Sequence, residues 1–410
     1  MSRPRRSLPA GARPPRVLLA TRIFTPEVAA ASFRLDAVAR ALVEAGARVR
    51  VLTSLPPDCD ASHDPEGVSV RRARTLRDAS GYIRGYLQYL SFDIPLAARL
   101  LLTRPRPDVV LAEPPPTTGA AVRVACGLLG VPYVHYAADV WSDASASMGV
   151  PRAVVGALRA VERFALRGAT RVIAINRGVA DRVRELGARD VAVVLNGIDT
   201  STFAPVPADP GAPSSADGEP RDLPDGPYLI YAGTASEWQG AGIFVDAFDR
   251  LRDALPGLHL VYMGQGADMD ALARRTAGDP RVHVIGQRPP AEAAAWQARA
   301  AAALVSIVPG QGYDFAYPTK VLAALACGTP VVYAGVGPAA DDIRGADLGA
   351  VAGSFDAPAV AAAIEEVLAR PREAERLRGW VIEHRSLSAT GRGAARVILD
   401  AASAGRRLRA

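Results

Sequence analysis

The chain has 410 residues, of which 49% are hydrophobic and 22% are charged, and its net charge at pH 7 is +6. This length accommodates two domains of about 200 residues, each with its own core. The three cysteines, Cys59, Cys126 and Cys327, lie far apart and lack metal-ligand spacing, so we expect no disulfide framework, no metal site and a cytoplasmic protein. No stretch approaches the roughly 18 uninterrupted apolar residues of a membrane span.

Charge is unevenly distributed along the chain. Residues 1–200 hold 28 arginines and 18 acidic residues, whereas the remainder holds 20 basic and 24 acidic residues. The N-terminal half is therefore expected to face something anionic. No interleaved aromatic and basic stripe or zinc-finger spacing indicates nucleic acid.

Residues 81–103 combine aromatic and aliphatic residues with arginines, and they follow Arg71, Arg72, Arg74 and Arg77. An apolar face rimmed by arginine can lie in the interface of an anionic bilayer, so we expect peripheral attachment to the inner face of the cell membrane. An ordinary packed helix pair with a solvated edge is the alternative.

In chain order, residues 1–15 are rich in Pro and Arg and predict a disordered basic tail. Apolar, β-branched runs then alternate with amphipathic helical patterns. In the first half we predict strands at 16–20, 48–53, 108–113, 133–139, 172–176 and 191–195, and helices at 33–45, 119–129 and 152–167.

The second half repeats this alternation after residues 202–227, a Pro-, Gly- and Ser-rich segment that predicts a linker. Strands are expected at 228–232, 258–263, 282–285, 303–308 and 330–333, and helices at 243–255, 268–277, 291–300 and 319–326. The pattern predicts an α/β protein with two facing Rossmann-like doubly wound domains, 16–201 and 228–385, and a C-terminal helix over 386–410 that can return to the first domain.

Lys320 is the only lysine among 48 basic residues. It lies in the run Pro318-Thr319-Lys320, where Thr319 is expected to be the N-cap of a helix. A cation in the first turn of a helix is disfavoured unless an anion occupies the site, so Lys320 predicts a phosphate site. The alternative is a surface lysine that survived by drift.

Several segments together resemble the retaining glycosyltransferases of family 4, which have the two-Rossmann GT-B fold and use nucleotide-diphosphate sugars. Within that family, these segments are similar to the branch that builds bacterial surface polysaccharides. The most specific match is Asn196-Gly197-Ile198-Asp199-Thr200, which is similar to the family's domain junction. The resemblance rests on residues 16–27, 34–49, 139–149, 196–205, 231–240 and 318–332.

The resemblance implies metal-independent transfer with retention, no cofactor, and a nucleotide-sugar donor bound by the second half. The donor-site residues expected on this basis are Gly233, Thr234, Gln239, Gly264, Gly266, Arg288, Asp314, Thr319 and Lys320. Lys320, the helix start at Thr319 and the Gly233-Thr234 turn are expected to stabilise the departing diphosphate. The acceptor is expected to be lipid-linked or a saccharide.

In the first half, Arg22, Glu27 and Arg34 surround the first loop and are interpreted as acceptor-side residues that meet a phosphate, with a surface role for Arg34 as the alternative. Asp139 is interpreted as a catalytic group that holds the acceptor hydroxyl, or as an N-cap. His135 is a further catalytic candidate, together with Lys320 and Asp139, or else a core histidine.

This chain also departs from the family pattern. Family members commonly place Glu at both ends of an E-x7-E motif, and those positions look like Phe315 and Ala323 here. Asp314 is a candidate substitute for the first Glu, or a solvated turn residue. These departures keep open a catalytically impaired binding subunit, and the similar architecture of nucleotide-sugar 2-epimerases keeps open an epimerase.

Overall fold

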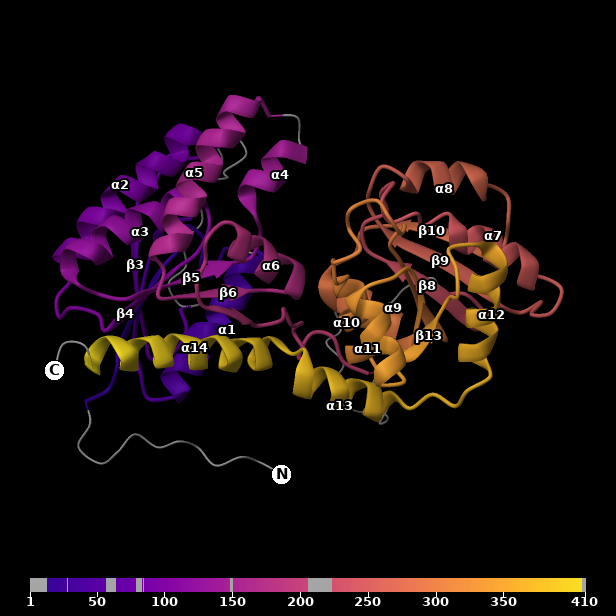
Figure 1. Cartoon of the computed structure of the whole chain (residues 1–410). Helices are drawn as coiled ribbons and strands as arrows, with labels where there is room; N and C mark the ends of the chain where they lie inside the picture. The colour runs from indigo at the N-terminus through magenta and orange to yellow at the C-terminus, as the bar shows by residue number, and fades with distance from the viewer. Residues whose placement is uncertain are drawn as a thin grey trace. The chain divides into compact units, whose positions relative to one another are not determined.

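The computed structural model describes residues 13–27, 29–56, 64–78, 83, 85–147, 150–205 and 223–407. It forms two compact units, residues 1–196 with 387–410 and residues 197–386, which are described separately below (Figure 1). Nearly all of the predicted tail 1–15, and residues 206–222 of the predicted linker, lie outside the described residues. The second unit begins at Gly197, earlier than the predicted boundary after residue 201.

The first unit contains a parallel sheet in the order β3-β2-β1-β4-β5-β6-β7. The inner strand β1 pairs with β2 on one side and β4 on the other, so that Leu18 lies opposite both Arg50 and Val110. The strands are β1 (Arg16–Ala20), β2 (Arg48–Ser54), β3 (Val68–Ala73), β4 (Val109–Ala112), β5 (Tyr133–Ala137), β6 (Arg171–Ala174) and β7 (Val191–Val193).

Helices cover both faces of this sheet because successive strand residues are apolar and point to opposite sides. Val17 and Leu19 pack towards α1 and α14, whereas Leu18 and Ala20 pack towards α2, α3, α5 and α6. The helices of this unit are α1 (Ala30–Glu44), α2 (Tyr86–Leu102), α3 (Pro116–Leu129), α4 (Trp141–Ser147), α5 (Arg152–Gly168), α6 (Arg177–Glu185) and α14 (Leu387–Arg407).

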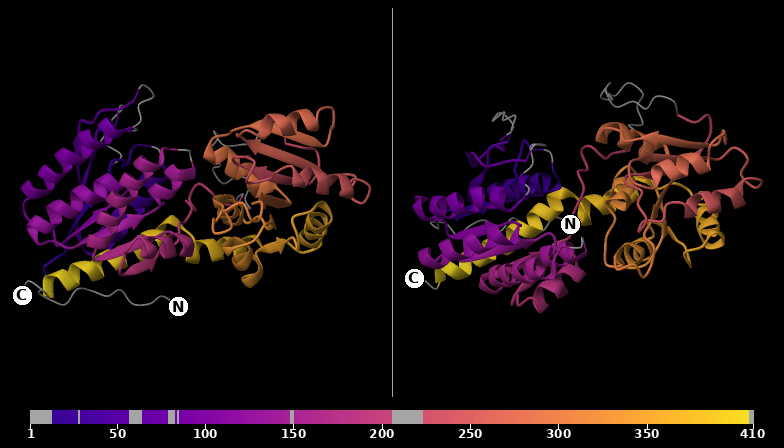
Figure 2. Two further views of the ribbon diagram at one scale, coloured as in Figure 1. Left: turned by 45° about the horizontal axis from the view of Figure 1, so that its top comes forward. Right: turned by 90° about the horizontal axis from the view of Figure 1, so that it is seen from above.

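The predicted C-terminal helix belongs to the first unit, as the sequence pattern allowed. Both views of Figure 2 show α14, in yellow, alongside the first unit, and its Ile398 and Ala402 are buried with Leu35 and Leu42 of α1. Gly391 makes this close packing possible, because a Cβ there would lie 2.3 Å from the carbonyl oxygen of Ala37 in α1.

The second unit contains a parallel sheet in the order β10-β9-β8-β11-β12-β13. Its strands are β8 (Tyr228–Ala232), β9 (His259–Gly264), β10 (Val282–Gly286), β11 (Ala302–Ser306), β12 (Val331–Ala334) and β13 (Gly349–Val351). Its helices are α7 (Ile243–Leu251), α8 (Met269–Arg275), α9 (Pro290–Arg299), α10 (Thr319–Ala326), α11 (Pro338–Gly345), α12 (Ala357–Leu368) and α13 (Ala374–His384).

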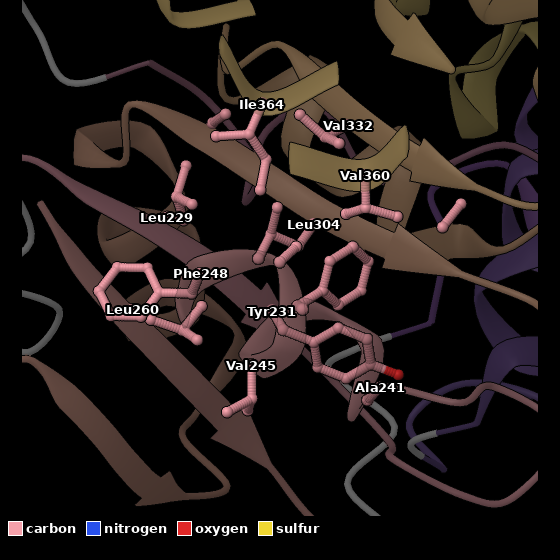
Figure 3. Packing of buried hydrophobic residues seen from close by; sticks show 14 of the residues in the cluster. Leu229, Tyr231, Ala241, Val245, Phe248, Leu260, Leu304, Val332, Val360 and Ile364 are labelled. Carbon is pink, nitrogen blue, oxygen red and sulfur yellow. The ribbon is translucent and has the colours of Figure 1, made fainter. Parts of the chain in front are cut away.

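Two cores flank this second sheet. Figure 3 shows the one in which Leu229 and Tyr231 of β8 meet Phe248 of α7 and Ile364 of α12. On the other face, Tyr228 and Ile230 pack against α9, α10, α11 and α13. Both units are thus doubly wound, and the predicted α/β class with two Rossmann-like domains is confirmed.

Two strands were not predicted. β3 carries Arg71 and Arg72 at the sheet edge and is only partly buried, and β13 has three residues, so neither shows a long apolar run. Cys126 and Cys327 are buried free thiols, and Cys59 lies outside the described residues. Among the described helices, none is both long enough and apolar enough to cross a membrane.

Removing the side chain of Ile398 tests the contribution of α14 to the first unit. Ile398 is 0% exposed, so Ile398→Ala should lower the free energy of unfolding by about 2–5 kcal/mol through lost burial and a cavity. Urea unfolding monitors this. Ile382→Ala in α13, at a position 44% exposed, is the matched control and should change stability by less than about 0.5 kcal/mol. Equal losses would contradict the assignment of α14 to a buried layer.

Candidate active site

In the second unit, polar groups collect where the order of strands reverses. Chain connections run outward from β8 through β9 to β10 and from β11 through β12 to β13, so the reversal lies between β8 and β11. Loops leaving the carboxyl ends of these neighbouring strands diverge there and leave room for a ligand. The Gly233-Thr234 turn follows β8, and the loop from residue 307 to α10 follows β11.

Lys320 lies at this reversal point, folded over the Gly233 turn. Its Nζ donates to the carbonyl oxygen of Thr234 at 2.8 Å and lies 4.9 Å from the ring centroid of Tyr231. Burial lowers the pKa of Lys320 to about 8, and no carboxylate among the described residues offsets this effect. An ammonium held with one carbonyl partner and no counter-ion is suited to bind an anion.

Gly233 makes the position of Lys320 possible. Its φ is +130°, and a Cβ would lie 2.8 Å from Cε of Lys320. Gly264 and Gly266 allow the end of β9 and its turn to lie close to the turn after β8. A Cβ at Gly264 would lie 2.1 Å from the carbonyl oxygen of Gly233, and one at Gly266 would lie 2.0 Å from that of Ala235. The structure therefore brings Gly233, Gly264, Gly266 and Lys320 together.

The start of α10 differs from the prediction. Pro318, not Thr319, is the N-cap, and no side chain caps the helix. Thr319 is the first helical residue because proline fixes an extended conformation just before it, which leaves the Thr319 side chain exposed. The first turn of α10 thus keeps backbone N–H groups available beside Lys320.

Gln239 stabilises the loop after β8. It is buried, its Oε1 accepts hydrogen bonds from N and Oγ of Ser236, both at 3.1 Å, and its carbonyl oxygen accepts from Oγ of Ser306 at 2.6 Å. Thr234 is exposed. Thr234 can therefore contact a ligand directly, whereas Gln239 acts by holding the turn in place.

Asp314 has a similar structural role in the loop after β11. Both carboxylate oxygens accept from N of Gly310, at 3.0 and 3.2 Å. Phe315 is 49% exposed, and Ala323 is buried in α10, so the two positions that resemble the E-x7-E glutamates offer no carboxylate. Trp238 stacks on Tyr313 with ring centroids 4.7 Å apart, so aromatic surface lies beside this loop.

Arg288 follows β10, at the edge of the sheet. It pairs with Glu292 at 3.3 Å and is partly exposed. Since β9 separates β10 from β8, Arg288 is not one of the groups gathered around Lys320.

In the first unit the strand order reverses between β1 and β4, and a buried ion pair lies there. Nη2 of Arg34 donates to Glu113 at 2.8 Å, and the hydroxyl of Thr21 donates to the same carboxylate at 3.2 Å. Burial raises the pKa of Glu113, and the charges of Arg34 and Arg22 oppose that rise. Glu113 was not singled out in the sequence because it was assigned to the preceding strand, although it directly follows β4.

Arg22 is buried beside this pair. Its guanidinium carbon lies 4.4 Å from the ring centroid of Tyr89 and 5.7 Å from that of Trp141, and its Nη1 donates to Ile83 at 3.1 Å. Its Nε has no hydrogen-bond partner among the residues that the structure describes. Burial lowers the pKa of Arg22, and the charges of Tyr89, Glu113 and Asp93 oppose the shift.

The other three first-half candidates differ in position. Glu27 forms an ion pair with Arg77, which donates to both of its carboxylate oxygens at 3.2 and 3.1 Å. Asp139 is exposed after β5; desolvation raises the pKa of its carboxyl and the charge of Arg34 opposes the rise. His135 is buried against Gly119 of α3, and burial lowers its pKa to about 4, which favours the core-histidine interpretation over the catalytic one.

The described residues contain no group of three or more His, Cys, Asp or Glu side chains placed to hold a metal ion. Within these residues, Lys320 is a positively charged side chain at the second unit's reversal point, and Arg22 and Arg34 lie at that of the first.

Two family models match successive parts of the chain. A glycosyl transferase 4-like domain matches residues 29–197, and glycosyl transferases group 1 matches residues 226–370. The chain belongs to the glycosyltransferases of the GT-B type. The resemblance to GT-B glycosyltransferases seen in the sequence is confirmed, whereas retention stays a prediction.

Two curated relatives are similar to parts of this glycosyltransferase. Glycogen synthase of Mycobacterium tuberculosis strain H37Rv is 28% identical over 53% of this chain and 50% of its own length. The GDP-mannose-dependent α-(1-6)-phosphatidylinositol monomannoside mannosyltransferase of Mycolicibacterium smegmatis is 30% identical over 46% of this chain and 50% of its own length. The chain thus spans about half the length of the curated relatives it matches.

Solved structures share the fold over nearly the whole chain. Anabaena HepE in complex with UDP and glucose has a TM-score of 0.61 at 17% identity, covering 93% of this chain and 98% of its own. WaaG, a glycosyltransferase involved in lipopolysaccharide biosynthesis, has a TM-score of 0.60 at 17% identity, covering 93% and 99%.

The lowered pKa of Lys320 predicts pH-dependent binding of a nucleoside diphosphate. The free lysine loses its proton as pH rises through about 8, whereas a bound anion raises its pKa, so affinity should fall by up to about tenfold between pH 7 and pH 9. Lys320→Arg should remove this dependence, since a guanidinium stays charged.

Calorimetry with UDP and with GDP at both pH values measures the effect. Arg288→Gln is the control, because it removes a cation at the sheet edge and should leave the pH dependence intact. An unchanged pH dependence in Lys320→Met would show that another group titrates.

The Arg34–Glu113 pair predicts a stability effect in the first unit. Glu113→Ala leaves Arg34 buried without its partner, so the free energy of unfolding should fall by about 3–5 kcal/mol. Arg34→Met/Glu113→Leu should recover most of the loss. Urea unfolding compares these with Glu185→Ala, which breaks an exposed pair with Arg182 and should cost at most about 1 kcal/mol. A double variant as unstable as Glu113→Ala would contradict the argument.

Proposed function

We propose that this chain transfers a sugar from a nucleotide-diphosphate sugar to a hydroxyl of a lipid-linked or saccharide acceptor, with retention and without a metal ion. The observation that carries the proposal is Lys320, an ammonium at the reversal point of the second unit that has no carboxylate partner in the described part of the chain. The donor class is supported by HepE, whose structures contain UDP and UDP-glucose, and by the GDP-mannose-dependent relative.

The chemistry requires stabilisation of a leaving group. As the glycosidic bond breaks, negative charge accumulates on the departing diphosphate, and fixed donors lower the barrier by binding that charge more strongly in the transition state. Nζ of Lys320, the backbone N–H groups at the start of α10 and the Gly233-Thr234 turn provide such donors. Nζ would exchange its single contact with Thr234 for a stronger one with a phosphate oxygen.

On the acceptor side, Arg22 supplies positive charge at the first unit's reversal point, which suits an acceptor that carries a phosphate, whereas Glu113 compensates the charge of Arg34 beside it. Asp139, exposed after β5, is the group we assign to the acceptor hydroxyl. Glu27 is paired with Arg77, and His135 is buried. Glu27 and His135 therefore act by supporting the surrounding structure.

We place this reaction in the synthesis of cell-surface polysaccharide or glycolipid, on the cytoplasmic side of the membrane. Support comes from WaaG, a glycosyltransferase involved in lipopolysaccharide biosynthesis, and from the mannosyltransferase relative, whose name gives phosphatidylinositol monomannoside as its substrate.

A second candidate is a subunit that binds the donor without transferring sugar. Phe315 and Ala323 favour it, since no carboxylate stands at either position and Asp314 is engaged with Gly310. An epimerase is less well supported, because buried His135 lacks access to a substrate. Product analysis separates the three: a glycoside, no product, or an epimerised sugar nucleotide without acceptor.

Replacing Lys320 tests the transferase directly. Lys320→Met keeps an apolar side chain but removes the charge, so kcat/KM should fall about 10²–10³-fold, the cost of losing a buried oxyanion donor. Lys320→Arg should recover part of the activity, because its wider fork does not reproduce a point charge. The assay uses a competent pair found by screening UDP- and GDP-sugars, and melting temperatures check the fold.

Near wild-type kcat/KM in Lys320→Met would refute the role of this lysine. Activity should persist in EDTA. NMR should show that the anomeric carbon in the product keeps the configuration, α or β, that it has in the donor. Loss of activity in EDTA that Mg²⁺ restores, or inversion at the anomeric carbon, would refute the corresponding part of the proposal.

A further inference from the structure

The outer layer of the first unit formed by α2, α3 and α5 has an unusual charge balance. α3 packs between α2 and α5, and the three helices cover one face of the sheet (Figures 1 and 2). They contain only two carboxylates, Asp93 and Glu162, which are 3% and 4% exposed. Their arginines are Arg99, Arg123, Arg152, Arg159, Arg163 and Arg167.

Both carboxylates are engaged inside the unit. Asp93 accepts from the hydroxyl of Thr118 at 2.6 Å. Glu162 accepts from the backbone N–H groups of Trp141 and Ser142, at 2.8 and 3.2 Å, at the start of α4. Neither compensates the arginines on the outer side.

Four of these arginines line a groove between α3 and α5. Its volume is about 410 Å³, and its lining consists of Arg123, Gly156, Arg159, Ala160, Arg163, Phe164 and Arg167. Spacings of four residues along α5 place Arg159, Arg163 and Arg167 on one side of that helix.

Two arginines of the groove have partners, and two are uncompensated. Arg159 lies 3.4 Å from Asp143, and Arg123 stacks 4.0 Å over the ring of Phe164 while donating to its carbonyl oxygen. Among the described residues, no carboxylate pairs with Arg163 or Arg167. Neighbouring like charges repel, so the groove is complementary to an anion such as a phosphate.

Exposed apolar side chains also lie on these three helices. They are Leu87, Leu90, Ile94 and Leu102 of α2, Val124 and Leu128 of α3, and Phe164 of α5. On α1 and α14, which cover the opposite face of the sheet, the described side chains include one large exposed apolar residue, Phe33. A soluble phosphate would need only the groove, whereas a bilayer interface uses the arginines and the apolar side chains together.

We propose that this outer face of α2, α3 and α5 binds an anionic bilayer, with lipid phosphates in the arginine groove and the apolar side chains in the interface. The surface includes part of the predicted segment 81–103, but its basic component differs from the prediction. Arg72 pairs with Asp64 and Arg77 with Glu27, and Arg99 donates to backbone carbonyls. The proposal does not depend on transferase activity.

Vesicle co-sedimentation of the full chain tests the proposal. The protein should sediment with phosphatidylcholine vesicles that contain phosphatidylglycerol, but not with phosphatidylcholine alone, and high salt should release it. Arg163→Gln/Arg167→Gln should lower the partition coefficient about 30-fold, and Ile94→Ser/Leu128→Ser should lower it as well.

Arg392→Gln/Arg396→Gln is the matched control. It removes two exposed arginines with the same spacing from α14, on the opposite layer, and should retain most of the binding. Melting temperatures should stay unchanged in both arginine variants, because these side chains are exposed.

Four results would overturn the proposal. Equal losses in the two arginine variants would show dependence on net charge alone. Equal binding to neutral vesicles would show that the arginines are dispensable, and protein left in the supernatant with both vesicle types would exclude the bilayer. Inorganic phosphate that binds through Arg163 and Arg167 in calorimetry, without sedimentation, would assign the groove to a soluble anion.

Discussion

The positive charge held at the carboxyl ends of parallel strands is the feature on which the proposed chemistry depends. A doubly wound sheet is buried on both faces, so polar groups can reach solvent only at strand ends. In this chain Arg22 and Arg34 occupy the reversal point of one sheet and Lys320 that of the other. The apolar layers on either side hold these cations in place, because the strands and helices that carry them are packed at near-zero exposure.

The two reversal points differ in how their charge is compensated. Arg34 is neutralised by Glu113, which is itself fixed by Thr21, so that end of the first sheet is a closed network apart from the buried Nε atoms of Arg22 and Arg34. Within the described ranges, Lys320 has a carbonyl oxygen and an aromatic face as partners, but no carboxylate. These residues therefore do not offset the cost of burying it, and an anionic ligand is the partner that would offset it.

The sequence predicted the sheets well because buried parallel strands are uninterrupted apolar runs, as in Tyr228–Ala232 and Arg16–Ala20. It failed for β3, whose edge position allows arginines, and for the N-cap of α10, where the conformation of Pro318 decided the helix start. In the candidate site, Lys320 and the glycines could be singled out because each belongs to a short local motif, such as Pro318-Thr319-Lys320 or Gly233-Thr234. Glu113 and Asp93 could not be assigned, because their importance comes from packing against Arg34, Arg22 and Thr118, far away in the sequence.

The arginine content of this chain gives Lys320 its significance. Several arginines perform tasks that require a fork of donors: Arg372 bonds to the carbonyl oxygens of Ala298, Ala300 and Gly328, and Arg378 to those of Thr200, Phe203 and Ala326. A lysine could not reproduce such geometry, since its donors radiate from a single atom. At position 320 the requirement is reversed. The space above Gly233 accepts a slender chain with Cε against the glycine and one bond from Nζ, and a planar guanidinium would meet the same backbone with a wider head group. Many of the arginines are thus required by the hydrogen bonds that they form. The single lysine occupies a position whose shape admits an ammonium.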